Sequence, residues 1–170
     1  SWWLTTDAGA AVNLLTVDST GNTRNQKTYT VTGGEDKIEL SNKNLGPADI
    51  NLISAWLATD AGAAVEAVAI GGNPIGSEGG ATLLETIKTS KLKTIDIGKP
   101  LPLQEPYESD TLDLSNTQMD PGHVLLLSWW LGTEFSAAVA LLSLDSTGVP
   151  KTTRGSRWEV EDSGPRTYTL

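Results

Sequence analysis

The 170-residue sequence contains no cysteine and a single histidine. Without cysteine, disulfide bonds and thiolate metal sites are excluded. Positive charge is also scarce, because 12 Lys and Arg stand against 21 Asp and Glu and give a net charge of -9. Binding to phosphate groups depends on clustered positive charge, so we expect neither nucleic acid nor an anionic membrane surface as a partner.

Long hydrophobic runs are missing as well. No stretch approaches the roughly 18 consecutive apolar residues of a membrane-spanning helix, so membrane insertion is not expected. The sequence has no Asn-x-Ser/Thr sequon, which slightly favours a cytoplasmic over a secreted protein. The sequence otherwise leaves the compartment open.

Groups that would indicate an enzyme are few. There is no thiol nucleophile, no Ser/His/acid set with a group to orient the histidine, and no His or Cys cluster for zinc. His123 follows a Pro-Gly pair and is predicted to be a solvated turn residue. We therefore expect a protein without catalytic activity, metal site or cofactor.

A repeated tryptophan-containing segment organises the chain. Residues 1–12 read Ser-Trp-Trp-Leu-Thr-Thr-Asp-Ala-Gly-Ala-Ala-Val, and residues 54–65 keep ten of these twelve residues. A third copy, residues 128–139, keeps the Trp-Leu step, the Thr followed by an acid, and the final Ala-Ala-Val. Internal repeats of this kind set the architecture before any local signal does.

The repeat extends upstream of the tryptophan segment. The 74-residue offset between the second and third copies also maps residues 38–42 onto 112–116, and residues 158–165 supply a matching start for the first copy. The two termini should therefore meet in space and close a ring. We predict a single domain, residues 1–170, made of three units: residues 38–111 with an insertion at 71–107, residues 112–157, and residues 158–170 joined to 1–37.

Each unit is predicted to contain four strands, because β-forming residues and turn residues alternate at short intervals. The predicted strands are residues 38–41, 50–59 and 63–70, and residues 27–32 for the fourth type. The insertion adds two more, residues 82–87 and 93–97, beside glycine pairs interpreted as flexible. Three such units predict an all-β fold with pseudo-three-fold symmetry, closed into a ring like a β-prism, with a β-trefoil-like barrel or a β-sandwich as alternatives.

The tryptophans divide between the two faces of the predicted strand at 50–59. Trp3, Trp56 and Trp130 share one face, where they predict a three-fold core cluster. Trp2 and Trp129 fall on the other face and are expected in an interface or a binding surface. Both faces of these strands are largely apolar, so we also expect a homo-oligomer.

The loop after the tryptophan segment is the only repeated polar feature. An acid beside a hydroxyl and backbone N–H groups suits the hydroxyls of a sugar, and a nearby ring can stack on the sugar. We therefore predict a carbohydrate-binding lectin with up to three equivalent loop sites and with glycans or glycoproteins as partners. The candidate residues are Thr6, Asp7, Gly9, Thr59, Asp60, Gly62, Thr133, Glu134, Trp2 and Trp129.

Other interpretations of the same features stay open. The acid and the Thr could simply close a tight turn. The apolar strands could belong to a self-assembling structural protein, such as a viral coat or decoration component. A pore-forming or toxin-like β protein and a glycoside hydrolase are further alternatives.

Overall fold

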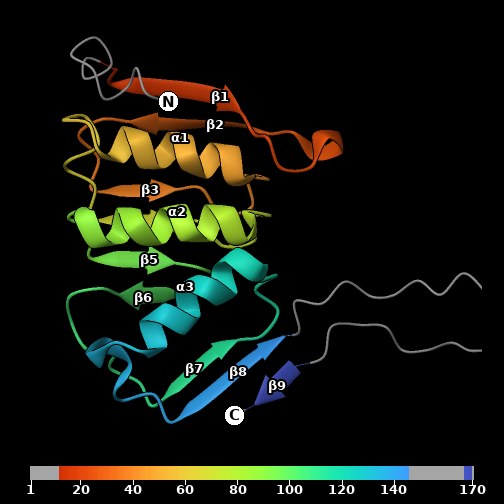
Figure 1. The fold of residues 1–170 in the computed structure, drawn as a ribbon, viewed down its shortest axis with the longest axis vertical. Helices are drawn as coiled ribbons and strands as arrows, with labels where there is room; N and C mark the ends of the chain where they lie inside the picture. The colour runs from red at the N-terminus through yellow and green to blue at the C-terminus, as the bar shows by residue number, and fades with distance from the viewer. Residues whose placement is uncertain (1–11, 146–166, 170) are drawn as a thin grey trace, which may run out of the picture.

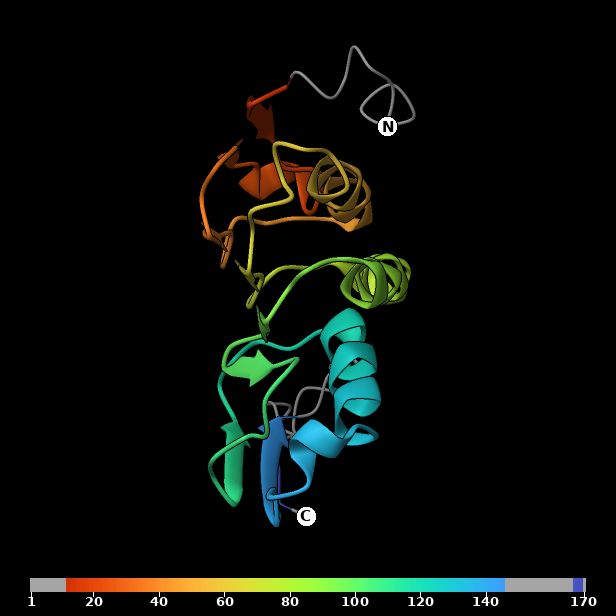
Figure 2. The same ribbon diagram turned by 90° about the vertical axis from the view of Figure 1, so that its left-hand side faces the viewer.

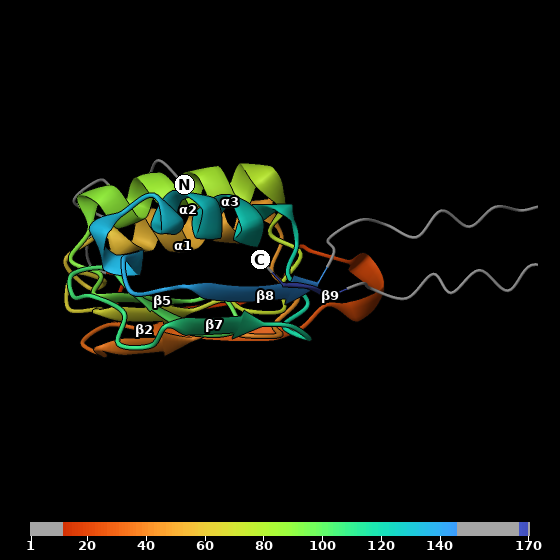
Figure 3. The same cartoon turned by 90° about the horizontal axis from the view of Figure 1, so that it is seen from below.

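The computed structural model describes residues 12–145 and the backbone of residues 167–169. The chain forms two layers, with the helices on one side and the strands on the other (Figures 2 and 3). The strands are β1 (Leu14–Asp18), β2 (Thr28–Thr32), β3 (Lys37–Glu39), β4 (Ala67–Ala69), β5 (Thr94–Asp96), β6 (Pro100–Pro102), β7 (Thr111–Leu114), β8 (Leu141–Asp145) and β9 (Thr167–Thr169). The helices are α1 (Pro47–Leu57), α2 (Gly76–Thr89) and α3 (Pro121–Leu131), with short 3-10 turns η2 (Thr23–Asn25) and η3 (Glu134–Ser136).

The repeating element is a strand followed by a helix that returns the chain to the start of the next strand (Figure 1). Strands β3, β4 and β5 run parallel, as do β7 and β8. Along these strands two apolar residues separated by one position point into the core. The buried pairs are Ile38 with Leu40, Val68 with Ile70, Ile95 with Ile97, and Leu112 with Leu114. The units therefore stack side by side around one continuous core, as in a solenoid.

An antiparallel strand ends each of the three sheets. The strand orders are β1-β2, β3-β4-β5-β6 and β7-β8-β9, and β2, β6 and β9 are the antiparallel members. Strands β1 and β9 lie at opposite ends of the stack (Figure 1). The predicted all-β ring is therefore wrong, in both its β-prism and β-trefoil forms, because the chain is a mixed α/β stack that does not close on itself.

The segment predicted as a strand at 50–59 is helical. Helix α1 begins at Pro47 and α3 at Pro121, and proline suits the first turn of a helix because it has no N–H to leave unpaired. In α1 the buried residues include Ile50, Ile53 and Trp56, a spacing that matches the helical period and not the period of two of a strand. Apolar residues lay on both faces of the predicted strand, so the helical spacing of the buried residues could not be distinguished from a continuous apolar run.

Other predicted strands have mixed outcomes. The strand at 27–32 is confirmed as β2 and that at 93–97 as β5, and of the strand at 38–41 residues 38 and 39 are confirmed in β3. Only Ala67–Ala69 of the predicted strand at 63–70 is extended as a strand. Residues 82–87 lie within α2. Residues 71–107, interpreted as an insertion, thus contribute a helix and two strands to the stack.

Helices α2 and α3 approach closely at two glycines. Gly80 of α2 and Gly122 of α3 are buried, and a Cβ on Gly80 would overlap the backbone of Gly122. A Cβ on Gly122 would overlap the backbone at Gly76. The prediction that Gly79 and Gly80 are flexible is therefore wrong, because both are buried in helix contacts: Gly80 packs against α3, and Gly79 packs against Pro47 and Ile50 of α1.

The tryptophans of α1 and α3 anchor their own units. Trp56 and Trp130 are fully buried. The indole N–H of Trp56 donates to the Val12 carbonyl at 3.2 Å, and that of Trp130 donates to the Pro102 carbonyl at 2.7 Å. Core positions for these two side chains are confirmed, but a three-fold cluster is not, since α2 lies between their helices (Figure 1). Trp3 is outside the described residues.

A buried asparagine links neighbouring units. The Asn73 side chain accepts a hydrogen bond from the Leu45 N–H at 3.0 Å. It donates to the carbonyls of Leu40 at 2.8 Å and Ile70 at 2.6 Å. One side chain thereby satisfies backbone groups of both the β3 and β4 units, which would otherwise be buried without partners.

Candidate functional site

The described threonines of the predicted loop sites form hydrogen bonds at the C-terminal ends of helices. The Thr59 hydroxyl donates to the Trp56 carbonyl, and the Thr133 hydroxyl donates to the Trp130 carbonyl, both at 2.6 Å. These are carbonyls of the last helical turn, which has no intrahelical partners for its C=O groups. The two hydroxyls are therefore engaged in closing α1 and α3.

The acids of the same loops are exposed and lie in separate units. Asp60 and Gly62 line a hollow of about 320 Å³ together with Ser90 and Lys91, beyond the end of α2. Glu134 opens η3 after α3. Thr6, Asp7, Gly9 and Trp2 are outside the described residues. Sugar binding by these loops stays a prediction.

Trp129 lies on the outer surface of α3. It is partly buried, and with Leu84, Val124 and Leu125 it lines a mainly apolar hollow of about 650 Å³ between α2 and α3. Its predicted place at a surface is consistent with this position, and its role in binding stays a prediction.

A polar hollow that the sequence interpretation missed lies at the carboxyl ends of the parallel strands. Two adjoining pockets, of about 390 and 460 Å³, share Asn42, Gly72 and Gln118. We call their combined surface the polar groove. It is lined by Asn25, Gln26, Lys27, Ser41, Asn42, Asn44, Gly71, Gly72, Pro74, Asp96, Gly98, Asn116, Thr117 and Gln118.

The backbone of the polar groove is unusual. Asn42, Asn44, Asn116 and Gln118 have φ of 58°, 60°, 60° and 54°, and they are the non-glycine residues with positive φ in the described part of the chain. Side chains rarely adopt this left-handed conformation, and Asn tolerates it best. Each pair follows a parallel strand and turns the chain toward the next helix. Such strained residues concentrate at functional sites.

Several groove groups are already engaged. The Asn44 side chain accepts from the Asn22 N–H and donates to the Asn22 carbonyl, each at 2.9 Å. The Lys27 ammonium donates to the Asn42 carbonyl at 2.7 Å, and Asp96 accepts from the Gly98 N–H at 2.8 Å. These contacts fix the walls of the groove.

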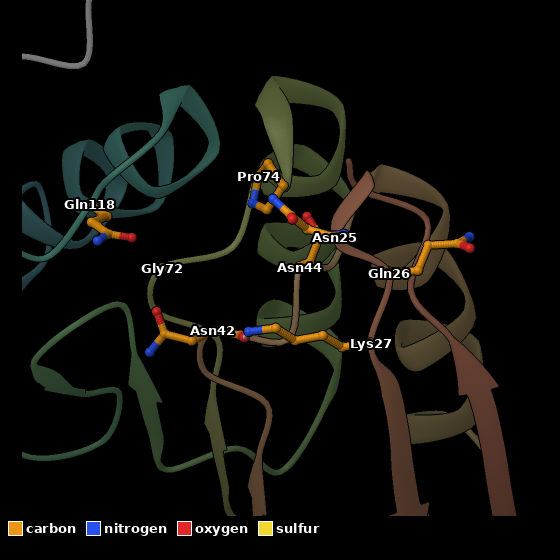
Figure 4. Close-up of a pocket in the computed structure, with 8 residues that line it drawn as sticks. All are labelled: Asn25, Gln26, Lys27, Asn42, Asn44, Gly72, Pro74 and Gln118. Atoms are coloured by element: carbon orange, nitrogen blue, oxygen red, sulfur yellow. Dashed lines mark hydrogen bonds between the residues drawn. The ribbon is translucent and has the colours of Figure 1, made fainter. Parts of the chain in front are cut away.

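Three of the amide side chains that stand on left-handed backbone are free to meet a ligand. Asn42, Asn116 and Gln118 are exposed, and their side-chain amides make no hydrogen bond to any described residue. Figure 4 shows Asn42 and Gln118 on either side of Gly72, while the Lys27 side chain runs toward Asn42. The Gln26 side chain points away from this centre (Figure 4).

The chemistry of the polar groove suits binding. Lys27 and Asp96 are its charged side chains, and the remaining polar groups are amides, hydroxyls and backbone. Amides both donate and accept hydrogen bonds but do not ionise near neutral pH, so they serve recognition better than acid–base chemistry. Within residues 12–145 no three His, Cys, Asp or Glu side chains gather as they would around a metal ion. In the same range no helix is both long enough and apolar enough to cross a bilayer.

His123 is buried, so its predicted place in a solvated turn is wrong. Its Nε2 lies 3.2 Å from the Ile70 carbonyl, and its Nδ1 lies 3.1 Å from the Asp120 N–H and 2.7 Å from Asp120 Oδ1. The other Asp120 oxygen accepts from the Gly76 N–H at 2.6 Å. Burial raises the pKa of Asp120, but the hydrogen bonds from His123 and Gly76 outweigh it and leave that pKa lowered. This pair ties the start of α3 to the start of α2 and to β4.

A sequence signal for the polar groove did exist. Residues 41–44, 71–74 and 115–118 are polar or glycine-rich, and each follows a strand with alternating apolar residues. Two of these stretches also precede a proline that begins a helix, Pro47 or Pro121. Three similar loops after parallel strands meet at one edge of a sheet. That inference required the helices to be recognised first.

Comparison with known proteins gives no match among protein-family models, curated proteins or solved structures.

Proposed function

We propose that this protein is a non-catalytic binding module that holds a glycan, or a similar polyhydroxylated ligand, in the polar groove. The observation that carries the proposal is the set of three free amides on left-handed backbone, those of Asn42, Asn116 and Gln118. The proposal keeps carbohydrate as the ligand class and moves the site from the helix-end loops to the carboxyl edge of the strands.

The ligand class follows from hydrogen-bond complementarity. A sugar hydroxyl both donates and accepts, and so does a side-chain amide. Few charges line the groove, which disfavours strongly ionic ligands. The pocket volumes of about 390 and 460 Å³ fall within the usual range for small-ligand sites.

The repeating unit also supports a binding module. Residues 65–75 read Val65-x-x-Val68-x-Ile70-x-x-Asn73-x-Ile75, which resembles the leucine-rich-repeat pattern L-x-x-L-x-L-x-x-N-x-L. The other strand–helix units depart from it, since Lys43 and Thr117 stand where Asn73 stands. Stacked units of this kind present an extended surface, and extended surfaces are used for recognition.

A glycan array probed with the full chain tests the proposal. Asn116→Gly with Gln118→Gly removes two free amides while keeping residues that accept positive φ. We expect at least about tenfold weaker binding of any sugar that the wild type retains, because several hydrogen bonds are lost together. Gln104→Ala, an exposed amide outside the polar groove, is the matched control and should bind normally. Absence of binding to every sugar would exclude the proposal.

A second set of variants distinguishes a sugar site in the helix-end loops from one in the polar groove. Asp60→Ala and Glu134→Ala alter the exposed loop acids and leave the polar groove intact. Sugar binding that is lost in these variants and retained in the groove variant would return the site to the helix ends.

Self-assembly is the second candidate function. The observation in its favour is the apolar hollow of about 650 Å³ lined by Leu84, Val124, Leu125 and Trp129, since exposed apolar patches of this kind mark interaction sites. Light scattering of the purified chain distinguishes a monomer from an oligomer or larger particle. A monomer at all concentrations would remove this candidate.

A further inference from the structure

Strands β1 and β8 are copies of one another. Residues 14–21 and 141–148 are identical at six of eight positions. Each strand pairs with an antiparallel strand in the same register, so that Val17 faces Tyr29 and Leu144 faces Tyr168. The two hairpins can therefore be compared position by position.

The second edge of β8 is occupied by a parallel strand. Strand β7 pairs with it from Thr111 opposite Leu141 to Leu114 opposite Leu144. The Leu141 N–H donates to the Asp110 carbonyl at 2.9 Å. At the other end, the Asn116 N–H donates to a carboxylate oxygen of Asp145 at 2.6 Å. Main-chain groups on this edge of β8 are thus used.

The equivalent edge of β1 is open in the described part of the chain. Hydrogen bonds from Gly33 N–H to the Asn13 carbonyl and from Ser19 N–H to the Lys27 carbonyl show that odd-numbered residues face β2. The main-chain groups of Leu14, Thr16 and Asp18 therefore face the other way, where no described strand pairs with β1. Leu14 is 61% exposed, against 41% for its equivalent Leu141.

We propose that β1 is a docking edge for a strand from another polypeptide, which adds parallel to β1 as β7 adds to β8. The occupant is an extended segment with apolar residues at alternating positions, as in Leu112-x-Leu114. Its main-chain N–H and C=O groups pair with those of Leu14, Thr16 and Asp18, the mode known as strand addition. This inference is independent of ligand binding in the polar groove.

Burial along the two strands supports this occupant. Leu15 is half-buried, whereas its equivalent Leu142, with β7 beside it, is only 8% exposed. Asp18 matches Asp145. One Asp18 oxygen accepts from the Thr28 hydroxyl at 2.6 Å, and the other is in place to accept from an N–H two residues beyond the apolar pair of the added strand, as Asp145 accepts from Asn116. An open edge of this type is a recognised site for pairing with another chain.

A peptide with the sequence of residues 108–119 is the probe. We expect saturable one-to-one binding to the full chain, with hydrogen exchange at Leu14, Thr16 and Asp18 slowed about tenfold, since these amides become hydrogen-bonded. A spin label at the peptide N-terminus should broaden signals near Leu14 more than those near Asp18, because the strands run parallel. A peptide carrying Leu112→Asp and Leu114→Asp should not bind.

Two proline variants make the test specific. Thr16→Pro removes an N–H from the open edge and keeps the pairing with β2, so peptide binding should fall at least about tenfold. Thr30→Pro is the matched control, because Thr30 faces Thr16 across the hairpin and their hydroxyls lie 3.0 Å apart. It loses the same hydroxyl contact but leaves the edge of β1 intact, so it should bind the peptide like the wild type.

Four results would overturn the proposal. Slow exchange at Leu14, Thr16 and Asp18 without peptide, at low protein concentration, would mean that the chain covers its own edge. Protection that appears only as protein concentration rises would identify a second copy as the occupant. Antiparallel broadening by the spin label, or no saturable binding at about 1 mM peptide, would exclude the parallel strand.

Discussion

The Tyr29 hydroxyl donates to the Asp49 carboxylate at 3.1 Å, which joins the first hairpin to the start of α1. The other Asp49 oxygen accepts from the Thr20 N–H at 2.7 Å, the Thr20 hydroxyl at 2.8 Å and the Gly46 N–H at 2.8 Å. Asp49 is buried, and four donors from three segments converge on it. This carboxylate therefore forms a buried link between the β1-β2 hairpin and the start of α1, in addition to the contacts of Asn44 with Asn22 and of Lys27 with Asn42.

Asp49→Ala should destabilise the protein strongly. It leaves four donors without their acceptor, so we expect a loss of about 3 kcal/mol in the free energy of unfolding. Tyr29→Phe removes one donor only and should cost about 1 kcal/mol. Urea denaturation measures both, with Asp60→Ala at an exposed acid as the control. An Asp49→Ala protein as stable as the control would contradict this account.

Tyr29 should make the protein less stable at alkaline pH. Burial, and then the charge of Asp49, raise the pKa of the Tyr29 phenol above its ordinary value of 10.0. Its proton is held more tightly in the folded than in the unfolded state, so the stabilisation is complete below about pH 10 and is lost as the pH rises further. Unfolding free energies between pH 8 and about 11 should fall less steeply in Tyr29→Phe than in the wild type. Parallel curves for the two proteins would refute the assignment.

Asp120 should have the opposite pH dependence. Its pKa is lowered below the ordinary value of 3.8, because the hydrogen bonds from His123 and Gly76 outweigh the effect of burial. The stabilisation is therefore present above about pH 4 and is lost as the pH falls through the lowered pKa. Asp120→Asn should cost about 1 kcal/mol at neutral pH and should lose less on acidification. Acid denaturation curves check this, and Asp60→Asn provides the exposed control.

Gly80→Ala should destabilise the protein although alanine favours helices. In an exposed helix this change would stabilise by about 1 kcal/mol. Here the added methyl overlaps the backbone of Gly122, so we expect a net loss of about 2 kcal/mol through overpacking. Thermal denaturation shows whether Gly80→Ala lowers or raises the stability of the protein. Ser77→Ala, on the exposed side of α2, is the control. A gain in stability would show that α2 and α3 can separate at little cost.

The repeat predicted from the sequence aligns real structural equivalents. The 74-residue offset places Pro47 on Pro121 and Trp56 on Trp130, and each pair has the same place in α1 and α3. The strand near Ile38 and the burial of the two tryptophans could therefore be predicted. The helices were missed because apolar residues such as Leu52 and Ala55 also lie outside the fully buried stripe of α1. The segment could therefore be fitted with the period of two of a strand as well as with the helical period.

The candidate site could be predicted less well. The Thr59 and Thr133 hydroxyls looked like ligand groups because the carbonyls that they bind belong to a helix that had not been recognised. Asn42 and Gln118 lie 76 positions apart in the sequence and meet only because parallel strands align their carboxyl ends. No local pattern contains that information, since it depends on how units stack.

The antiparallel strands β2 and β6 divide the stack into blocks, and β9 ends it (Figure 1). No ladder of main-chain hydrogen bonds joins β2 to β3 or β6 to β7 in the described part of the chain. Cooperativity between blocks then passes through the helix layer, through buried side chains such as Asp49, and through loop contacts such as the hydrogen bond from the Gly21 N–H to the Asn44 carbonyl. Loss of such a contact would allow one block to unfold while its neighbours stay folded. The helix layer therefore couples the unfolding of neighbouring blocks, whereas each sheet stabilises only its own block.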